Sequence, residues 1–252
     1  MYKTISGKAI SLLIIFVLWH ISSLLFNKDF FPNTIDTFKA LIVLLNEGEI
    51  YKHILSSAYR IISGTLLGTL AALPLGLILG WSRKADAYLG NIFNMLYPIP
   101  KVVFLPIIIV VMGIGDSPKI FLISLVVFFQ LTLTIRDAVR HIPNSIIQSM
   151  KALRPSFFQN LIHMILPACI LELLTALRGT IGVSTALLFI TENFASFTGL
   201  GYFITKSMDS RNFCDMYAGI LMLALLGVGI YFVLMLLEWK LCPWKRSESI
   251  SK

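Results

Sequence analysis

The stretch Pro143–Pro167, PNSIIQSMKALRPSFFQNLIHMILP, decides how the rest of this sequence is interpreted. It is polar and basic with a helical pattern of apolar residues, yet long apolar segments precede and follow it. A chain that crosses a bilayer several times places such a polar segment outside the hydrocarbon. The sequence therefore predicts a short helical element on one side of a membrane, connecting two membrane spans.

Local signals divide this stretch into two parts. Ser145 followed by Gln148 predicts a capping box at the start of a helix. Pro155 disfavours helical geometry at Arg154, so we expect a bend or a second short helix there. An apolar stripe at helical spacing is formed by Ile146, Met150, Leu153 and Phe157. This periodicity leaves two functions open: a helix that lies on the membrane surface, or one that docks a soluble partner.

The composition indicates a membrane protein. Of 252 residues, 57% are hydrophobic and 13% are charged, whereas a soluble domain carries about 25% charged residues. The net charge of +8 comes from basic residues scattered among apolar runs. We interpret them as orientation charges and expect no nucleic-acid partner. The three cysteines form no disulfide framework and the four histidines have no ligand spacing, so no metal site is predicted.

The apolar runs predict an all-α protein with about six transmembrane helices. A span needs about 20 apolar residues, and the candidates are 9–26, 58–80, 89–113, 119–136, 168–191 and 217–240. Three prolines, Pro98, Pro100 and Pro106, interrupt the third. With the N-terminus inside, twelve Lys and Arg residues lie inside and seven outside, which favours both termini in the cytoplasm. Between the first two spans we expect a surface helix with an apolar stripe of Ile35, Phe38, Leu41, Ile42 and Leu45.

Small residues recur every four positions along the second span, at Gly64, Gly68, Ala72, Gly76 and Gly80. Such a ridge lets another helix approach closely. It predicts helix packing, and the same helices could surround a pathway.

Several polar residues in the fifth span are candidates for a translocation path. Arg178 lies about ten residues into it, where a charge costs on the order of 2.5–3.5 kcal/mol. This side chain either attracts an anionic substrate or pairs with an acidic or carbonyl group, and we favour pairing; Glu172 is one possible partner. Thr185, Thr191, Glu192 and Asn193 could line the path or could be the ordinary polar residues of a helix end.

From about residue 56 to 204 the sequence resembles permease subunits of ABC importers, particularly the nitrate/taurine/aliphatic-sulfonate group. Their cytosolic signature is the EAA…G…I-LP loop, and Leu166-Pro167 matches its end. Arg154 stands where the family glycine belongs, Gln148-Ser149-Met150 stand at the EAA positions, and Met164 stands at the isoleucine position. Further resemblance lies in Ser57–Gly64, Pro74–Gly80, Tyr97–Pro100, Phe104–Pro106, Met112–Gly115, Leu177-Arg178 and Thr198–Tyr202.

This resemblance implies the type I ABC importer permease fold, with a cytosolic coupling helix at 144–158 that docks on an ATPase. The residues it implies for docking are Gln148, Ser149, Met150, Lys151, Leu153, Arg154, Ser156 and Phe157. The implied partners are two ATP-binding subunits, an extracytoplasmic solute-binding protein and a second permease copy, identical or different. The implied location is the bacterial plasma membrane. The implied cargo is a small anionic solute of sulfonate, taurine or nitrate type.

The chain has no P-loop, so we expect it to bind no cofactor, to catalyse no reaction itself, and to rely on ATP used by the partner subunit. We divide it into a first span with an outer connection (1–55), a permease core (56–242) with the coupling loop 137–167, and a cytosolic tail (243–252). Two alternatives stay open: a secondary transporter or channel without a motor, and a degenerate permease paralogue paired with another permease.

Overall fold

The computed structural model describes residues 2–26 and 28–243, with the side chains of all of these except 2–9, 12 and 157. Throughout the described ranges the regular secondary structure is helical. The chain forms two compact units, Met1–Ser57 with Glu192–Leu225, and Ala58–Thr191 with Leu226–Lys252. The unit boundaries fall inside three helices, α3 (Ile50–Trp81), α10 (Leu166–Asn193) and α12 (Phe213–Leu241). The predicted boundary at residue 55 stays a prediction, and most of the predicted tail, 244–252, lies outside the described residues.

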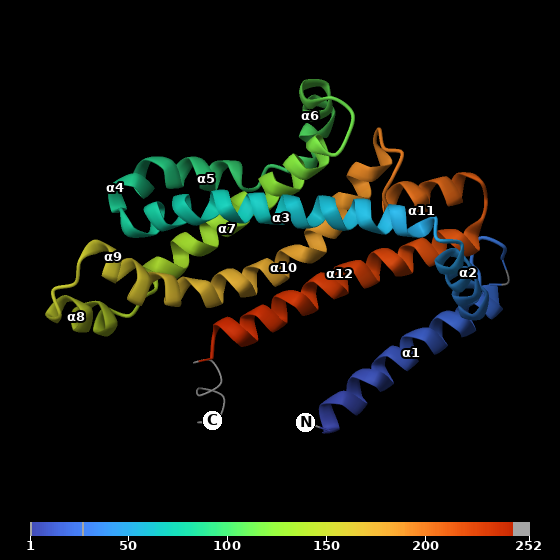
Figure 1. Ribbon diagram of the computed structural model, residues 1–252, viewed down its shortest axis with the longest axis horizontal. Coiled ribbons are helices and arrows are strands. Elements are labelled where there is room, and N and C mark those ends of the chain that lie inside the picture. Colours follow the sequence, from blue (N-terminus) through green and yellow to red (C-terminus); the bar gives the residue numbers. More distant parts are fainter. Residues whose placement is uncertain (1, 27, 244–252) are drawn as a thin grey trace. The chain divides into compact units, whose positions relative to one another are not determined.

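The first unit contains α1 (Tyr2–Phe26), α2 (Thr34–Glu47), α11 (Leu200–Asp209) and those parts of the three shared helices that fall within its bounds (Figure 1). Trp19 connects three of its segments. The indole Nε1–H donates to the carbonyl of Pro32 at 3.2 Å, and the indole ring stacks 5.7 Å from the ring of Tyr217. α1 is thereby fixed against the loop after it and the start of α12.

The surface helix predicted between the first two spans is α2. The Asn33 side chain caps it by accepting the N–H of Asp36 at 2.8 Å, and Gly48 ends it in the left-handed region at φ 83°. Its buried face consists of Thr34, Thr37, Leu41 and Leu44. Ile35 and Phe38, which we placed on the packed stripe, are exposed. The helix is confirmed, but most of the predicted stripe faces away from the unit.

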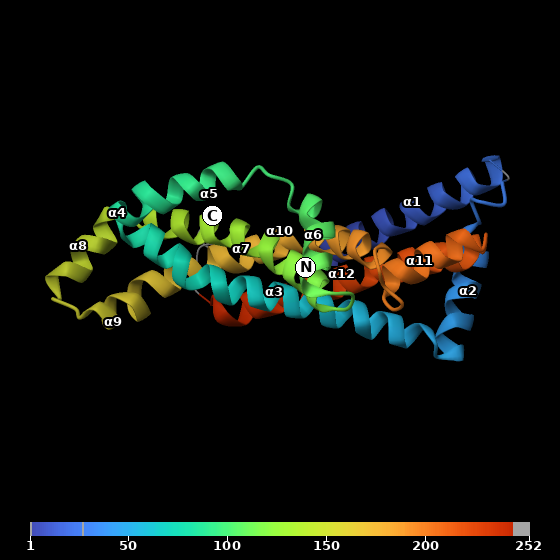
Figure 2. The same cartoon turned by 90° about the horizontal axis from the view of Figure 1, so that it is seen from above.

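The second unit holds the rest of α3, α10 and α12 and the remaining elements: α4 (Arg83–Ala85), the π-helix η1 (Asp86–Gly90), α5 (Asn91–Leu96), the 3₁₀ turn η2 (Lys101–Phe104), α6 (Leu105–Met112), α7 (Ser117–Arg140), α8 (Asn144–Ala152), α9 (Phe157–Asn160) and the π-helix η3 (Leu161–Ile165). In both views α8 and α9 lie at the same end of this unit as α4 (Figures 1 and 2).

The small residues of α3 lie directly against α7. A Cβ atom placed on Gly64 would be 2.8 Å from Cβ of Ile123, and one on Gly76 would be 2.7 Å from Cβ of Ile135. The same atom on Gly68 would be 2.6 Å from the backbone oxygen of Ser124. Real Cβ atoms do not approach so closely, so this distance between the two helices requires glycine.

The proline-rich third span is broken. Its two halves, Arg83–Leu96 and Lys101–Met112, are bent by 81°, and α6 turns away from α5 (Figure 1). Lys101 stands at the break with 9% of its surface exposed. Its Nζ donates to the carbonyls of Leu96 at 2.8 Å and Tyr97 at 2.6 Å. The ammonium group therefore satisfies carbonyls that a continuous helix would have bonded internally.

Four described helices are long and apolar enough to cross a membrane, and five spans result if the bent pair counts as one. They contain the predicted spans 58–80, 89–113, 119–136, 168–191 and 217–240. The predicted span 9–26 lies within α1.

Candidate functional site

α8 begins directly after Pro143 and has no side-chain cap. The predicted capping box of Ser145 and Gln148 is wrong, because the helix starts two residues earlier than an N-cap at Ser145 requires and Ser145 lies inside it. A capping box exists one helix later. The N–H of Ser156 donates to Oε1 of Gln159 at 2.7 Å, and the N–H of Gln159 donates to Oγ of Ser156 at 3.3 Å. This reciprocal pair starts α9.

A tight turn separates α8 from α9. The expected bend at Arg154-Pro155 is present, so the predicted coupling segment 144–158 consists of α8, this turn and the start of α9. Leu153 closes α8, and Arg154 adopts φ 46°, in the left-handed region. Glycine takes this conformation without a steric penalty. The position at which the sequence replaces the family glycine is thus the position at which the backbone has glycine-like geometry.

The segment from α8 to α9 presents unburied side chains. No residue of α8 is buried, and Leu153 in the turn is 75% exposed. The turn divides the predicted apolar stripe, since Ile146 and Met150 belong to α8 whereas Phe157 begins α9. Gln148, Ser149, Lys151, Arg154 and Ser156 are exposed, and Met150 is half-buried. The segment therefore exposes the apolar side chains of Ile146 and Leu153 among polar ones.

A cluster of charged side chains connects η1, α7 and the end of α3. The carboxylate of Asp86 in η1 lies 2.8 Å from Nη2 of Arg140 and 3.6 Å from Nη1 of Arg136, both on α7. Arg140 also donates to the carbonyl of Leu79 at the end of α3, at 3.3 Å. Arg136 has a second carboxylate partner in Asp137 at 2.8 Å. The cluster is partly enclosed, because the Asp86 side chain is 18% exposed.

Arg178 pairs with Glu238 of α12, at 2.7 Å between Nη2 and Oε2. Its guanidinium carbon also lies 5.8 Å from the centre of the Tyr231 ring. The Glu238 side chain is 6% exposed and the Arg178 side chain 18%. We expected a structural partner for Arg178, and the geometry provides one; the partner is Glu238 and not Glu172.

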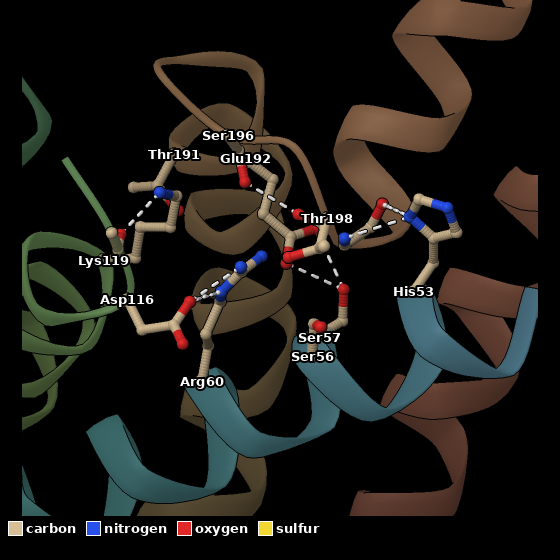
Figure 3. A network of polar contacts seen from close by, with 12 residues as sticks. His53, Ser56, Ser57, Arg60, Asp116, Lys119, Thr191, Glu192, Ser196 and Thr198 are labelled. Atoms are coloured by element: carbon tan, nitrogen blue, oxygen red, sulfur yellow. Dashed lines mark hydrogen bonds and ion pairs between the residues drawn. The ribbon is translucent and has the colours of Figure 1, made fainter.

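Glu192 at the end of α10 holds the first turn of α11 (Figure 3). Oγ of Ser57 lies 2.8 and 2.9 Å from the two carboxylate oxygens. The N–H of Gly201 donates to Oε2 at 2.8 Å, and the N–H of Leu200 donates to Oγ of Ser57 at 2.8 Å. A carboxylate at a helix N-terminus satisfies free N–H groups and complements the helix dipole. Nearby, Nδ1 of His53 lies 3.0 Å from the carbonyl of Gly199.

Two buried cations organise the loop between α6 and α7 in the second unit (Figure 3). Arg60 contacts Oδ1 of Asp116 with both Nε and Nη2, each at 2.7 Å. Lys119 donates from Nζ to the carbonyl of Gly115 at 2.7 Å. Arg60 and Lys119 are each 2% exposed. Their positions fix the residues that lead into α7.

The profile of a protein family described as the inner membrane component of binding-protein-dependent transport systems matches residues 64–241, more than two thirds of the chain. The chain belongs to this family. It is a multi-pass membrane permease of ABC importers, from a family of transport proteins and not of enzymes. The motor-independent transporter or channel is accordingly not favoured.

Relatives of the permease have names that specify their cargo. An aliphatic sulfonates transport permease, SsuC of Bacillus subtilis (strain 168), is 31% identical over 214 residues, covering 84% of this chain and 75% of that protein. The taurine transport system permease protein TauC of Escherichia coli (strain K12) is 28% identical over 198 residues, covering 79% and 72%.

The fold has a solved counterpart. A chain of the MetNI methionine ABC transporter, in inward-facing crystals, superposes with a TM-score of 0.66 at 18% identity, over 76% of this permease and 95% of that chain. The permease therefore has the type I importer fold that its sequence predicted.

The predicted path residues of the permease lie in different surroundings. Thr191 and Glu192 are fully buried, and the hydroxyl of Thr191 donates to the carbonyl of Leu188. Thr185 is half-buried, and Asn193 is exposed and accepts the Thr205 hydroxyl at 2.6 Å. Whether Thr185 and Asn193 line a path stays a prediction.

Sequence reasoning missed the acidic partners Asp86 and Glu238. Each is a carboxylate within or beside an apolar run, and such a residue in a membrane segment is a signal that a cation lies nearby. Among the described residues no three His, Cys, Asp or Glu side chains form a possible metal group. The absence of a metal or cofactor stays an expectation.

Proposed function

We propose that this permease docks on the ATP-binding subunits of its importer through α8 and the turn 153–156. The observation that carries the proposal is the unburied surface of this segment, with the 75% exposed side chain of Leu153 next to the left-handed Arg154. An apolar side chain that is exposed outside the membrane spans gains free energy when a partner covers it. Arg154 stands where the resemblance places a glycine, and its φ of 46° lies in the region that glycine adopts without a steric penalty, which supports a working coupling segment.

The rest of the assembly follows from the same proposal. Two permease copies, identical or different, would form the path, two ATPases would bind ATP, and an extracytoplasmic binding protein would deliver the solute. Both termini would be cytoplasmic, because that orientation places twelve Lys and Arg residues inside and seven outside. A small anion of sulfonate or taurine type is the proposed cargo, since relatives carry those names.

Copurification tests the docking surface. The permease variant Lys151→Glu/Leu153→Asp, coexpressed with its ATPase, should retain at least about tenfold less ATPase than the wild type, because changing an interface hot spot costs about 2 kcal/mol or more. The matched control is Phe197→Asp/Lys206→Glu, which makes the same two chemical changes at exposed positions of the first unit. Equal ATPase retention by both variants would contradict the docking assignment.

A further inference from the structure

A cavity of about 740 Å³ lies between the end of α3, the elements α4 and η1, the end of α7, and α8. It belongs entirely to the second unit, at the end where α4 and α8 lie near each other (Figures 1 and 2). Val139, Ile147 and Met164 form its apolar wall. Its volume is in the range of small-molecule binding sites.

Positive charge dominates the lining of this cavity. Three cations, Arg83, Arg140 and Lys151, and one carboxylate, Asp86, belong to it, which gives a net charge of +2. Arg140 already holds Asp86 at 2.8 Å. The side chains of Arg83 and Lys151, unlike their backbone carbonyls, form no hydrogen bond or ion pair with any residue in the described part of the chain. The lining of the cavity thus carries two cations in excess of its single carboxylate, and this excess of positive charge favours the binding of an anion.

The aromatic and apolar side chains around the cavity indicate which kind of anion it binds. Trp81 at the end of α3 lines the cavity and is 50% exposed, and Tyr88 in η1 is 79% exposed. Aromatic side chains of this kind lie at the level of lipid headgroups. Ile78 and Ile92, on the helices that lead away from the cavity, are about half exposed, as expected of surfaces that face acyl chains. The cavity is thus at the boundary between a basic surface and an apolar one.

We propose that this cavity binds the phosphate group of an anionic phospholipid. Phosphate accepts several charge-assisted hydrogen bonds, for which the guanidinium of Arg83 and the ammonium of Lys151 are suitable donors. Basic pockets between membrane helices on the cytoplasmic side bind such headgroups. Because Arg83 follows α3 and Lys151 belongs to α8, one bound phosphate bridges the membrane core and the coupling segment.

Native mass spectrometry of the full-length permease tests this proposal. Protein purified with phosphatidylglycerol should retain that lipid, whereas phosphatidylcholine should not be retained. Arg83→Gln/Lys151→Gln should lower phosphatidylglycerol affinity about 30-fold, about fivefold for each cation. Both side chains are exposed, so the double variant should fold. The charge-preserving Arg83→Lys/Lys151→Arg should retain the lipid.

The matched control is Lys39→Gln/Lys206→Gln, which removes two exposed cations from the first unit. It should bind phosphatidylglycerol as the wild type does. Equal loss in both double variants would mean a non-specific charge effect and would overturn the site. Retention unchanged in Arg83→Gln/Lys151→Gln would overturn it as well. In a further experiment, inorganic phosphate is added to the permease in place of lipid. If the permease binds free phosphate but retains no phosphatidylglycerol, the ligand is a soluble anion and the lipid assignment is wrong.

Discussion

Arg178 and Glu238 form an ion pair between α10 and α12. Arg178 could attract the substrate or serve only the structure, and the two roles predict different uptake by a variant that lacks both charges. The two side chains approach to 2.7 Å and are 18% and 6% exposed. Removing one partner of a buried pair leaves an uncompensated charge and costs about 3–5 kcal/mol. Because Arg178 keeps some exposure and the contact with the Tyr231 ring, we expect about 3 kcal/mol for each of Arg178→Met and Glu238→Met.

Removing both charges should cost far less than the sum. An apolar pair in place of a buried ion pair is often close to neutral, so Arg178→Met/Glu238→Met should recover most of the stability that either single variant loses. The assay is equilibrium unfolding of the purified permease in mixed micelles, arranged as a double-mutant cycle. Solute uptake by the assembled importer is the second readout.

Additive losses in the double-mutant cycle would refute the reasoning, because they would mean that the two side chains do not stabilise each other. Uptake separates the two functions. If Arg178 attracts the anionic solute, the double variant should be stable but should not take up solute. If Arg178 only stabilises the fold, the double variant should regain both stability and solute uptake. Lys206→Met, at an exposed position of the first unit, is the control for loss of a cation alone.

Two further changes test the α3–α7 contact and the coupling turn. Gly68→Val should destabilise the permease by about 1–3 kcal/mol through overpacking, since the Cβ of the valine would lie 2.6 Å from the Ser124 carbonyl oxygen. The control in the same unfolding assay is Gly229→Val, because a Cβ at Gly229 meets no atom within 4 Å. Equal stability of the two variants would count against the close contact between α3 and α7. Arg154→Gly should leave the turn intact or stabilise it by up to about 1 kcal/mol, because it removes a left-handed non-glycine residue. Arg154→Val should increase amide hydrogen exchange across residues 153–160, and equal exchange in the two Arg154 variants would show that the φ of this residue does not matter.

Periodicity and composition predicted the elements of this fold because they report local preferences and burial in lipid. Long apolar runs predicted the helices that could cross a membrane, and the prolines of the third span predicted its break. The bend at Arg154-Pro155 followed from the steric restriction that proline places on the residue before it. The capping box was assigned to the wrong serine, because Ser145 and Ser156 each precede a glutamine by three residues and only the true helix start distinguishes them.

The stretch Pro143–Pro167 determined by its sequence alone that a polar helical segment interrupts the membrane spans. Only the tertiary structure decided that Arg154 adopts a left-handed backbone, that Glu238 and not Glu172 neutralises Arg178, and that Lys101 bonds the carbonyls at a helix break. These outcomes depend on contacts between residues up to 60 positions apart or on a single local backbone angle. Hydrophobic periodicity does not predict which buried charged side chains form ion pairs. The pairing depends on how the helices pack and on the free-energy cost of leaving a charge unpaired in the membrane.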